Sequence, residues 1–326
     1  MKNQLETICV LACILLASSV VPAAAGEEES QIPAMPKWQS LYVGDFGAGR
    51  IYKVSHEGNF SVYAQGLGAP GQLVFDGDGN LYVAAAGAGT VWKITPTRDG
   101  SPATEKNGHL KLFCGGLLRP MALTFDPDDN LWVSEYVGEE YIDENGEKKR
   151  KPGALHKITP EGEKVTIAPE LEHPYGLAAG PDGNIYLAKL GGFEVVRYTL
   201  EGESTVLSRR AVYWLRNVEF GPDGTLYALG GKGISTIAAD GKVKEFCDWK
   251  RDGFRGTHRV GLGFDANGTL YSTAAAEKPR TAESRGYVYQ HGPDGTHRVF
   301  ARVGVSPFYI AFYPKEADDE SRTHDQ

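Results

Sequence analysis

The stretch FDGDGNLYV, residues Phe75–Val83, recurs along the chain with small changes. Further copies are FDPDDNLWV at 125–133, AGPDGNIYL at 179–187, FGPDGTLYA at 220–228 and FDANGTLYS at 264–272. In each copy a cluster rich in Asp, Gly and Asn separates two apolar runs, which is typical of a tight turn between two strands. The copies begin 41 to 54 residues apart. A repeat of this length, built from short strands, predicts the blades of a β-propeller.

Each repeat also contains a third and a fourth apolar run. RIYKV at 50–54 and TVWKI at 90–94 exemplify the third run, and FSVY at 60–63 and VKEF at 243–246 the fourth. A sixth repeat is divided between the ends of the chain, with IAFYP at 310–314 and SLYV at 40–43. Pairing these segments would close a ring and remove its open sheet edges. The sequence therefore predicts an all-β, six-bladed β-propeller, closed by an N-terminal strand that joins the C-terminal blade.

The first residues have the composition of an export signal. An apolar run from Ile8 to Val21 follows Lys2 and leads into PAAA at 22–25 and then EEE at 27–29. A short apolar run that ends in A-x-A predicts a secretory signal peptide over 1–25, and an uncleaved N-terminal anchor is the alternative. We expect a linker over 26–39, the propeller over 40–314 and a tail over 315–326. The protein is then exported, periplasmic or secreted, with no transmembrane segment after signal removal.

Composition narrows the functional classes. The chain has 326 residues, 41% of them hydrophobic, and a formal net charge of -8, which argues against both a disordered chain and a nucleic-acid partner. Of its four cysteines, two lie in the signal. Cys114 and Cys247 fall in the fourth strands of different blades, so we expect both to be unpaired. A monomer that binds a small molecule is expected.

The repeats resemble the NHL, SMP-30/gluconolactonase and streptogramin (virginiamycin B) lyase group of propellers, over nearly the whole chain after the signal. The resemblance implies the fold strongly. It implies function only weakly, because the group includes lactonases, a lyase that linearises cyclic antibiotics and non-catalytic scaffolds.

A functional site is expected at one face of the ring. In a blade, the start of the first strand and the end of the second strand meet on the same face, where loops carry function. Glu135, His173 and Lys189 are the candidate catalytic residues at this face. The candidate ligand-binding residues are Asp45, Arg119, Tyr136, Tyr175, Arg216, Asn217, His258 and Arg259.

These residue types suit acid–base chemistry on an anionic ligand. Glu135, with His173 or Lys189 beside it, could act as a general base or acid. The arginines could hold a carboxylate or an oxyanion. The alternative is that these charged side chains form ion pairs with one another, such as Glu135 with Lys189, and have only a structural role at the channel mouth. Long loops at 137–153 and 276–285 would form a partial lid, or would simply be solvated.

The resemblance sharpens these expectations. SMP-30-type lactonases hold a divalent metal, usually calcium, with Glu, Asn and Asp at first-strand starts. The corresponding positions here are Gly71, Met121, Tyr175, Asn217, Val260 and Phe308. Asn217 alone among them could ligate, so the family's metal ligands are not reproduced, and the cofactor, calcium included, is left open.

The streptogramin lyases supply a catalytic His from R-P-H-A and a Glu from W-F-T-E. Here RPMA at 119–122 and WVSE at 132–135 match that frame. Glu135 carries over, Met121 stands in place of the His, and His173 or His258 would have to substitute. The sequence thus favours an exported propeller that binds a small polar or anionic ligand in its channel, with hydrolysis or elimination of an ester or lactone as the candidate reaction. The alternative is an NHL-like scaffold or sensor that binds a protein or other partner.

Overall fold

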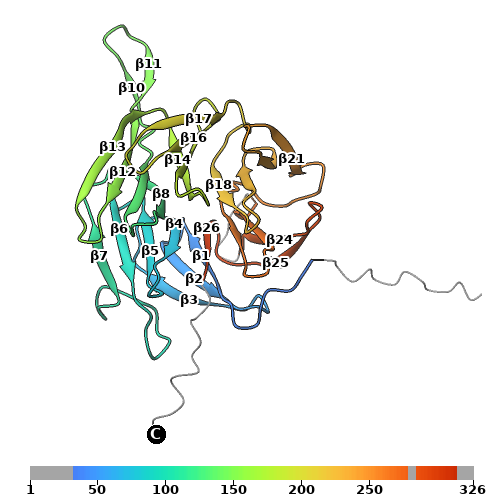
Figure 1. The fold of residues 1–326 in the computed structure, drawn as a ribbon. Helices are drawn as coiled ribbons and strands as arrows, with labels where there is room; N and C mark the ends of the chain where they lie inside the picture. The colour runs from blue at the N-terminus through green and yellow to red at the C-terminus, as the bar shows by residue number, and fades with distance from the viewer. Residues whose placement is uncertain (1–31, 278–283, 314–326) are drawn as a thin grey trace, which may run out of the picture. The chain divides into compact units, whose positions relative to one another are not determined.

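The computed structural model describes residues 32–277 and 284–313, and these form a ring of six four-stranded antiparallel sheets (Figure 1). The described residues contain no helix. The predicted all-β, six-bladed propeller is therefore confirmed. The expected signal peptide, the C-terminal tail from 315 and the centre of the 276–285 loop lie outside the described residues.

The strands of each blade follow one another from the centre of the ring outward. Blade 1 contains β4 (Pro70–Phe75), β5 (Leu81–Ala85), β6 (Thr90–Ile94) and β7 (Leu110–Cys114). Blade 2 contains β8 (Pro120–Phe125), β9 (Leu131–Glu135), β12 (Gly153–Ile158) and β13 (Lys164–Leu171). Blade 3 contains β14 (Pro174–Ala179), β15 (Ile185–Lys189), β16 (Glu194–Tyr198) and β17 (Ser204–Ser208).

The remaining blades complete the ring. Blade 4 contains β18 (Asn217–Phe220), β19 (Leu226–Leu229), β20 (Gly233–Ile237) and β21 (Val243–Asp248). Blade 5 contains β22 (Leu262–Phe264), β23 (Leu270–Ala274), β24 (Tyr287–His291) and β25 (His297–Ala301). Blade 6 contains β26 (Pro307–Phe312), β1 (Leu41–Asp45), β2 (Arg50–Val54) and β3 (Phe60–Gln65).

Blade 6 closes the ring as the divided repeat predicts. Strand β1 pairs with β26, with Tyr42 opposite Ala311 and Val43 opposite Ile310. All five residues of β1 are buried. The six first strands contact one another in order around the centre, so together they form the wall of the central channel.

The repeated turn has a local cause in the sequence. In blade 1 the carboxylate of Asp76 accepts hydrogen bonds from the backbone N–H of Asp78 and of Asn80. Gly79 has a φ of 79°, which is costly for residues with a Cβ. The turn fixes the strand register. The residue that precedes the last residue of each first strand therefore lies opposite an aromatic residue of the second strand, as Val74 lies opposite Tyr82.

The register corrects one position of the sequence alignment. Asn217 lies opposite Leu229, just as Ala122 lies opposite Ser134 in blade 2. Asn217 is therefore the counterpart of Ala122 and not of Met121, whose counterpart is Arg216. The sequence alignment was therefore offset by one residue in blade 4.

Two segments outside the blades are also described. Ile32 and Met35, in the expected linker, are buried, and the side-chain amide of Gln290 donates to Pro33 O at 2.6 Å. The loop at 137–153 forms a hairpin of β10 (Glu140–Ile142) and β11 (Lys148–Arg150), which projects outward from the ring (Figure 1). Its charges pair within the hairpin, as in Lys148–Glu140 at 3.2 Å.

Cys114 and Cys247 are both free and buried, which confirms the expectation that they do not pair. Over the described part of the chain, no helix has the length and apolarity needed to cross a membrane.

Candidate functional site

An apolar cluster occupies the end of the channel where the first strands begin. Met121, Tyr175, Val260 and Tyr309 are buried there. Phe46 and Phe308 stack above them with ring centroids 4.6 Å apart. This end of the channel is therefore filled mainly by side chains rather than by an open cavity.

Arginines surround this apolar cluster. The Arg119 guanidinium lies 5.6 Å from the ring centroid of Tyr136, and Tyr136 packs edge-on against Tyr175 at 5.5 Å. Burial raises the pKa of Tyr175 to about 12, against the opposing effect of the positive charges of Arg216 and Arg119. The positive charges of both arginines therefore act on the Tyr175 hydroxyl.

A pocket of about 340 Å³ adjoins this cluster in blades 4 and 5. It is lined by Trp214, Arg216, Gly230, Gly231, Trp249, Gly256, Thr257, His258 and Arg259. The lining contains no carboxylate, although Glu277 accepts a long hydrogen bond of 3.4 Å from Gly256 N–H nearby. We call this pocket the arginine mouth.

The guanidinium of Arg259 is held firmly in the arginine mouth. It donates to the carbonyl oxygens of Phe254 at 3.3 Å and Arg255 at 3.2 Å and lies 5.0 Å from the Trp249 ring centroid. Its Nε is buried without a hydrogen-bond partner among the described residues. Arg216 donates to Arg259 O at 3.4 Å, and His258 is exposed at the pocket rim. The structure thus brings Arg216, His258 and Arg259 together.

Glu135 faces its own blade. One carboxylate oxygen accepts from Leu118 N–H at 2.6 Å and the other lies 3.3 Å from His156 Nε2. Both side chains of this ion pair are less than a tenth exposed. Burial favours a raised pKa for Glu135, but the close contact with His156 and the hydrogen bond from Leu118 N–H outweigh it and lower the pKa. His156 was not among the sequence-predicted residues, because it lies on the third strand.

Lys189 and His173 have different surroundings. Lys189 Nζ lies 3.1 Å from Glu194, and the same carboxylate binds Arg209 at 2.6 Å. His173 has a left-handed backbone with φ of 47° and packs against Tyr136 with ring centroids 5.7 Å apart. Burial, and to a smaller extent the charge of Arg150, lowers the pKa of His173. The three catalytic candidates therefore do not share one cluster of contacts.

Asp45 is a ring-closing residue. Its carboxylate is fully buried and accepts from four backbone N–H groups, those of Gly47, Ala48, Val305 and Ser306, at 2.8 to 3.2 Å. These bonds tie the end of β1 to the segment that precedes β26. The carboxylate is thus already saturated by the backbone of the chain.

One residue beyond the starts of the first strands, three blades carry a polar side chain at the channel wall. Gln72, Asn217 and Tyr309 occupy equivalent positions, and Gln72 Oε1, Asn217 Nδ2 and Tyr309 Oη are buried without a partner among the described residues. A Cβ on Gly176, the blade 3 counterpart, would lie 2.5 Å from Asn217 Oδ1, so glycine permits the close approach there. Buried polar atoms of this kind ordinarily bind water or a ligand.

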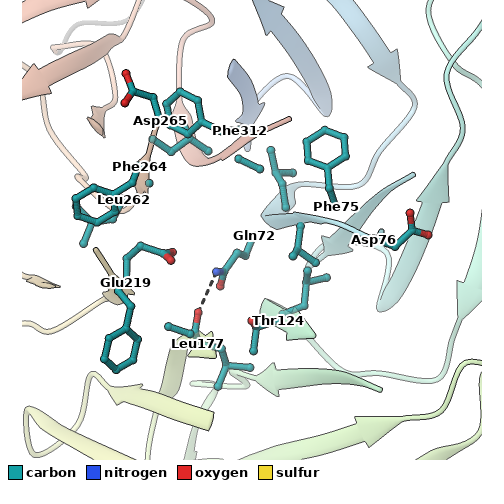
Figure 2. Close-up of a pocket in the computed structure, with 18 of the residues that line it drawn as sticks. Gln72, Phe75, Asp76, Thr124, Leu177, Glu219, Leu262, Phe264, Asp265 and Phe312 are labelled. Atoms are coloured by element: carbon teal, nitrogen blue, oxygen red, sulfur yellow. Dashed lines mark hydrogen bonds between the residues drawn. The ribbon is translucent and has the colours of Figure 1, made fainter. Parts of the chain in front are cut away.

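The other end of the channel opens into a larger pocket, of about 630 Å³. Gln72, Thr124 and Glu219 project into it from three blades, and Figure 2 shows the Glu219 carboxylate directed toward Gln72 across the centre. Burial raises the pKa of Glu219 to about 8. Sequence reasoning missed Glu219, because it compared the starts of the first strands and not the residues that precede their last ones.

Metal ligation finds little support in the described residues. They contain no group of three or more His, Cys, Asp or Glu side chains that could hold a metal ion. Asn217, the one candidate ligand of the sequence alignment, lies one residue beyond the first-strand starts, and its Oδ1 accepts from Val218 N–H at 3.0 Å. The residues present do not fit the SMP-30 type of calcium site.

Comparison with known proteins shows a shared fold. Virginiamycin B lyase from Staphylococcus aureus is 15% identical, with 82% of each chain covered and a TM-score of 0.55. A gluconolactonase from Xanthomonas campestris is 17% identical, covers 74% of this chain and 84% of its own, and has a TM-score of 0.58. A chain of a nidogen/laminin complex is 10% identical, covers 85% and 98%, and has a TM-score of 0.63. No protein-family model matches the chain, and no curated protein matches its sequence.

Proposed function

We propose that the protein binds a small anionic ligand, a carboxylate in the first instance, at the arginine mouth. The observation that carries the proposal is a pocket lined by Arg216, Arg259 and His258 with no carboxylate among its lining residues. Guanidinium groups bind carboxylates in a bidentate manner, and such charge-assisted hydrogen bonds are about twice as strong as neutral ones. The buried, unpartnered Nε of Arg259 leaves a donor available to a ligand.

The two tryptophans give the pocket an apolar side. Trp214 and Trp249 line it, and each ring lies within 6 Å of a guanidinium, 5.9 Å for Arg216 and 5.0 Å for Arg259. A ligand with a flat or apolar body and one carboxylate suits this lining, because the body can pack on the rings while the charge meets the arginines.

Titration calorimetry with a panel of aromatic and aliphatic carboxylates tests this proposal. We expect a carboxylate to bind and its neutral primary amide to bind at least tenfold more weakly. Arg259→Gln and Arg216→Gln should each weaken carboxylate binding at least tenfold, since each removes a charged donor. Arg50→Gln, an exposed arginine on β2, is the matched control and should bind normally. Equal binding of the carboxylate and the amide would overturn the proposal.

Turnover of an ester or lactone is a second candidate function. Its support is the fold shared with a gluconolactonase and with virginiamycin B lyase, together with the buried pair of Glu135 and His156. Glu135 would serve as the base and His156 would hold it ionised. A screen of lactones and esters, with and without calcium, should then detect turnover that Glu135→Gln abolishes. Carboxylate binding without any turnover would favour a non-catalytic binding protein or scaffold instead.

We also propose that the protein is exported. The apolar run from Ile8 to Val21 and the following AAA carry this proposal. The mass of the mature protein from its native host should correspond to a chain that begins near residue 26. A mass that includes residues 1–25 would instead favour the uncleaved anchor.

A further inference from the structure

The pocket at the end of the channel where the first strands finish contains one ionisable residue at a position that other blades fill with small side chains. Glu219 lies opposite Tyr227 in blade 4. The equivalent residues, each opposite the aromatic of its own second strand, are Val74, Thr124, Ala178, Gly263 and Ala311. The blade structure therefore does not require a carboxylate there. We call this cavity, centred on Glu219 and Gln72, the acceptor pocket.

Gln72 supplies a second, independent acceptor. Its side chain is 7% exposed, and its amide nitrogen donates to Leu177 O at 3.0 Å. With the amide fixed in this way, Oε1 is a buried acceptor that has no partner among the described residues (Figure 2). Leaving such an atom unsatisfied costs about 1–3 kcal/mol, so it favours a bound donor.

The rest of the lining favours a positive charge. No Lys, Arg or His lines the acceptor pocket, while Asp76 and Asp265 lie at its rim. Phe75, Phe220, Phe264 and Phe312 also line it. Each of these rings packs against a tyrosine of the preceding blade, so the attraction for a cation comes from the carboxylates of the lining rather than from ring faces.

We propose that the acceptor pocket binds a small organic ammonium ion, with its N–H groups donated to Glu219 and to Gln72 Oε1. A primary ammonium carries three donors, enough for both acceptors. An inorganic divalent cation is disfavoured, because calcium takes 6–8 oxygen ligands, whereas Glu219, Gln72 and Thr124 are the acceptor side chains that the described first strands direct into the pocket, with Asp76 and Asp265 at its rim. The acceptor pocket lies at the opposite end of the channel from the arginine mouth, so the two proposals stand independently.

Ammonium binding should release a proton. Burial raises the pKa of Glu219 to about 8, so at pH 7 the carboxyl is largely protonated. A bound cation stabilises the carboxylate, and the proton leaves to the buffer. Asp76 and Asp265 are the other titratable groups of the lining. The pKa of Asp76 is lowered, since its bonds to Asn80 and Lys93 outweigh burial, and it has no proton to release at pH 7.

Calorimetry with n-butylammonium as the probe tests the proposal, with n-butanol as its neutral isostere. We expect butylammonium to bind at least tenfold more tightly than butanol. Measured at pH 7 in two buffers of different ionisation enthalpy, binding should release part of one proton. Glu219→Gln should weaken binding at least tenfold and abolish the proton release. Gln72→Leu should weaken binding and keep the release. Glu161→Gln, an exposed carboxylate on a blade 2 turn, is the matched control.

Melting temperatures of all variants establish that they fold. Glu219→Gln removes a partly buried ionisable group, so it should fold at least as well as the wild type. The proposal is wrong if butylammonium and butanol bind equally, or if Glu219→Gln binds butylammonium like the wild type. It is also wrong if calcium binds at this pocket and butylammonium does not.

Discussion

Glu219→Gln should reveal the raised pKa of Glu219 as a pH-dependent gain in stability. Burial places the pKa of this carboxyl at about 8 in the folded chain, against 4.5 for an ordinary glutamate. Below pH 4.5 the group is protonated in both states and carries no penalty. Between pH 4.5 and 8 the unfolded chain releases a proton that the folded chain retains. Stability of the wild type, relative to the Gln variant, therefore falls as pH rises and levels off above pH 8.

The size of the effect follows from the same two values. A difference of about 3.5 pKa units, at 1.36 kcal/mol each, gives a ceiling of about 5 kcal/mol. Between pH 6 and pH 9 the advantage of the Gln variant should widen by roughly 2–3 kcal/mol. Water in the channel screens the charge, so the measured value should lie at or below this range.

Urea unfolding of the wild type and Glu219→Gln at pH 6, 7.5 and 9 provides the measurement. Comparing the difference between the two proteins removes the contributions of buried tyrosines such as Tyr175, which titrate in both. A stability difference that does not change with pH would refute the reasoning. It would mean that the carboxyl is solvated well enough to keep an ordinary pKa.

Four further predictions concern other parts of the molecule. Burial lowers the pKa of His291 to about 3, so the free energy of unfolding should fall as pH drops below 6.5, by about 2 kcal/mol at pH 5. In urea titrations, His291→Gln should abolish this contribution to the pH dependence of stability. Asp45→Ala should lower the free energy of unfolding by at least about 3 kcal/mol, because four backbone N–H groups lose their acceptor. An unchanged melting temperature with lost ligand binding would show instead that Asp45 binds the ligand. Glu135→Gln should lower the free energy of unfolding by about 1–3 kcal/mol, because His156 loses its charged partner. The effects of Glu135→Gln and Lys189→Ala should add within about 0.5 kcal/mol, since Lys189 pairs with Glu194. A larger coupling energy would mean that Glu135 and Lys189 interact. Thiol titration of the denatured, unreduced mature chain should count two thiols, and a count of zero in a monomer would contradict the free Cys114 and Cys247.

The fold could be predicted from the sequence because the same short sequence pattern recurs in the blades. Each copy of the Phe75–Val83 pattern contains its own turn and its own pair of strands, so short-range chemistry is enough to define a blade. The ring closure was also predictable, since the missing half of the last repeat stands at the other end of the chain.

The candidate site was harder to predict, because side-chain partners come from strands that the repeat does not single out. Glu135 lies at the expected end of β9, yet its partner His156 comes from β12. Lys189 finds Glu194 five residues further on, across the β15–β16 pair, rather than Glu135. The positional argument placed Glu135 and Lys189 at the ends of their second strands and placed Asn217 one residue off, and the direction of a side chain depends on packing that a repeat alignment does not contain.

The pairing of β1 with β26 has a consequence for synthesis of the chain. Strand β1 is made among the first residues of the propeller, and its partner among the last, more than 260 residues later. Until β26 leaves the ribosome, β1 presents an apolar sheet edge that other chains can pair with. Two newly completed molecules could each donate β26 to the other, and the resulting swapped dimer would contain complete blades. Translation that pauses or stops before residue 307 would leave that edge permanently open, so truncated chains should aggregate far more readily than the finished protein.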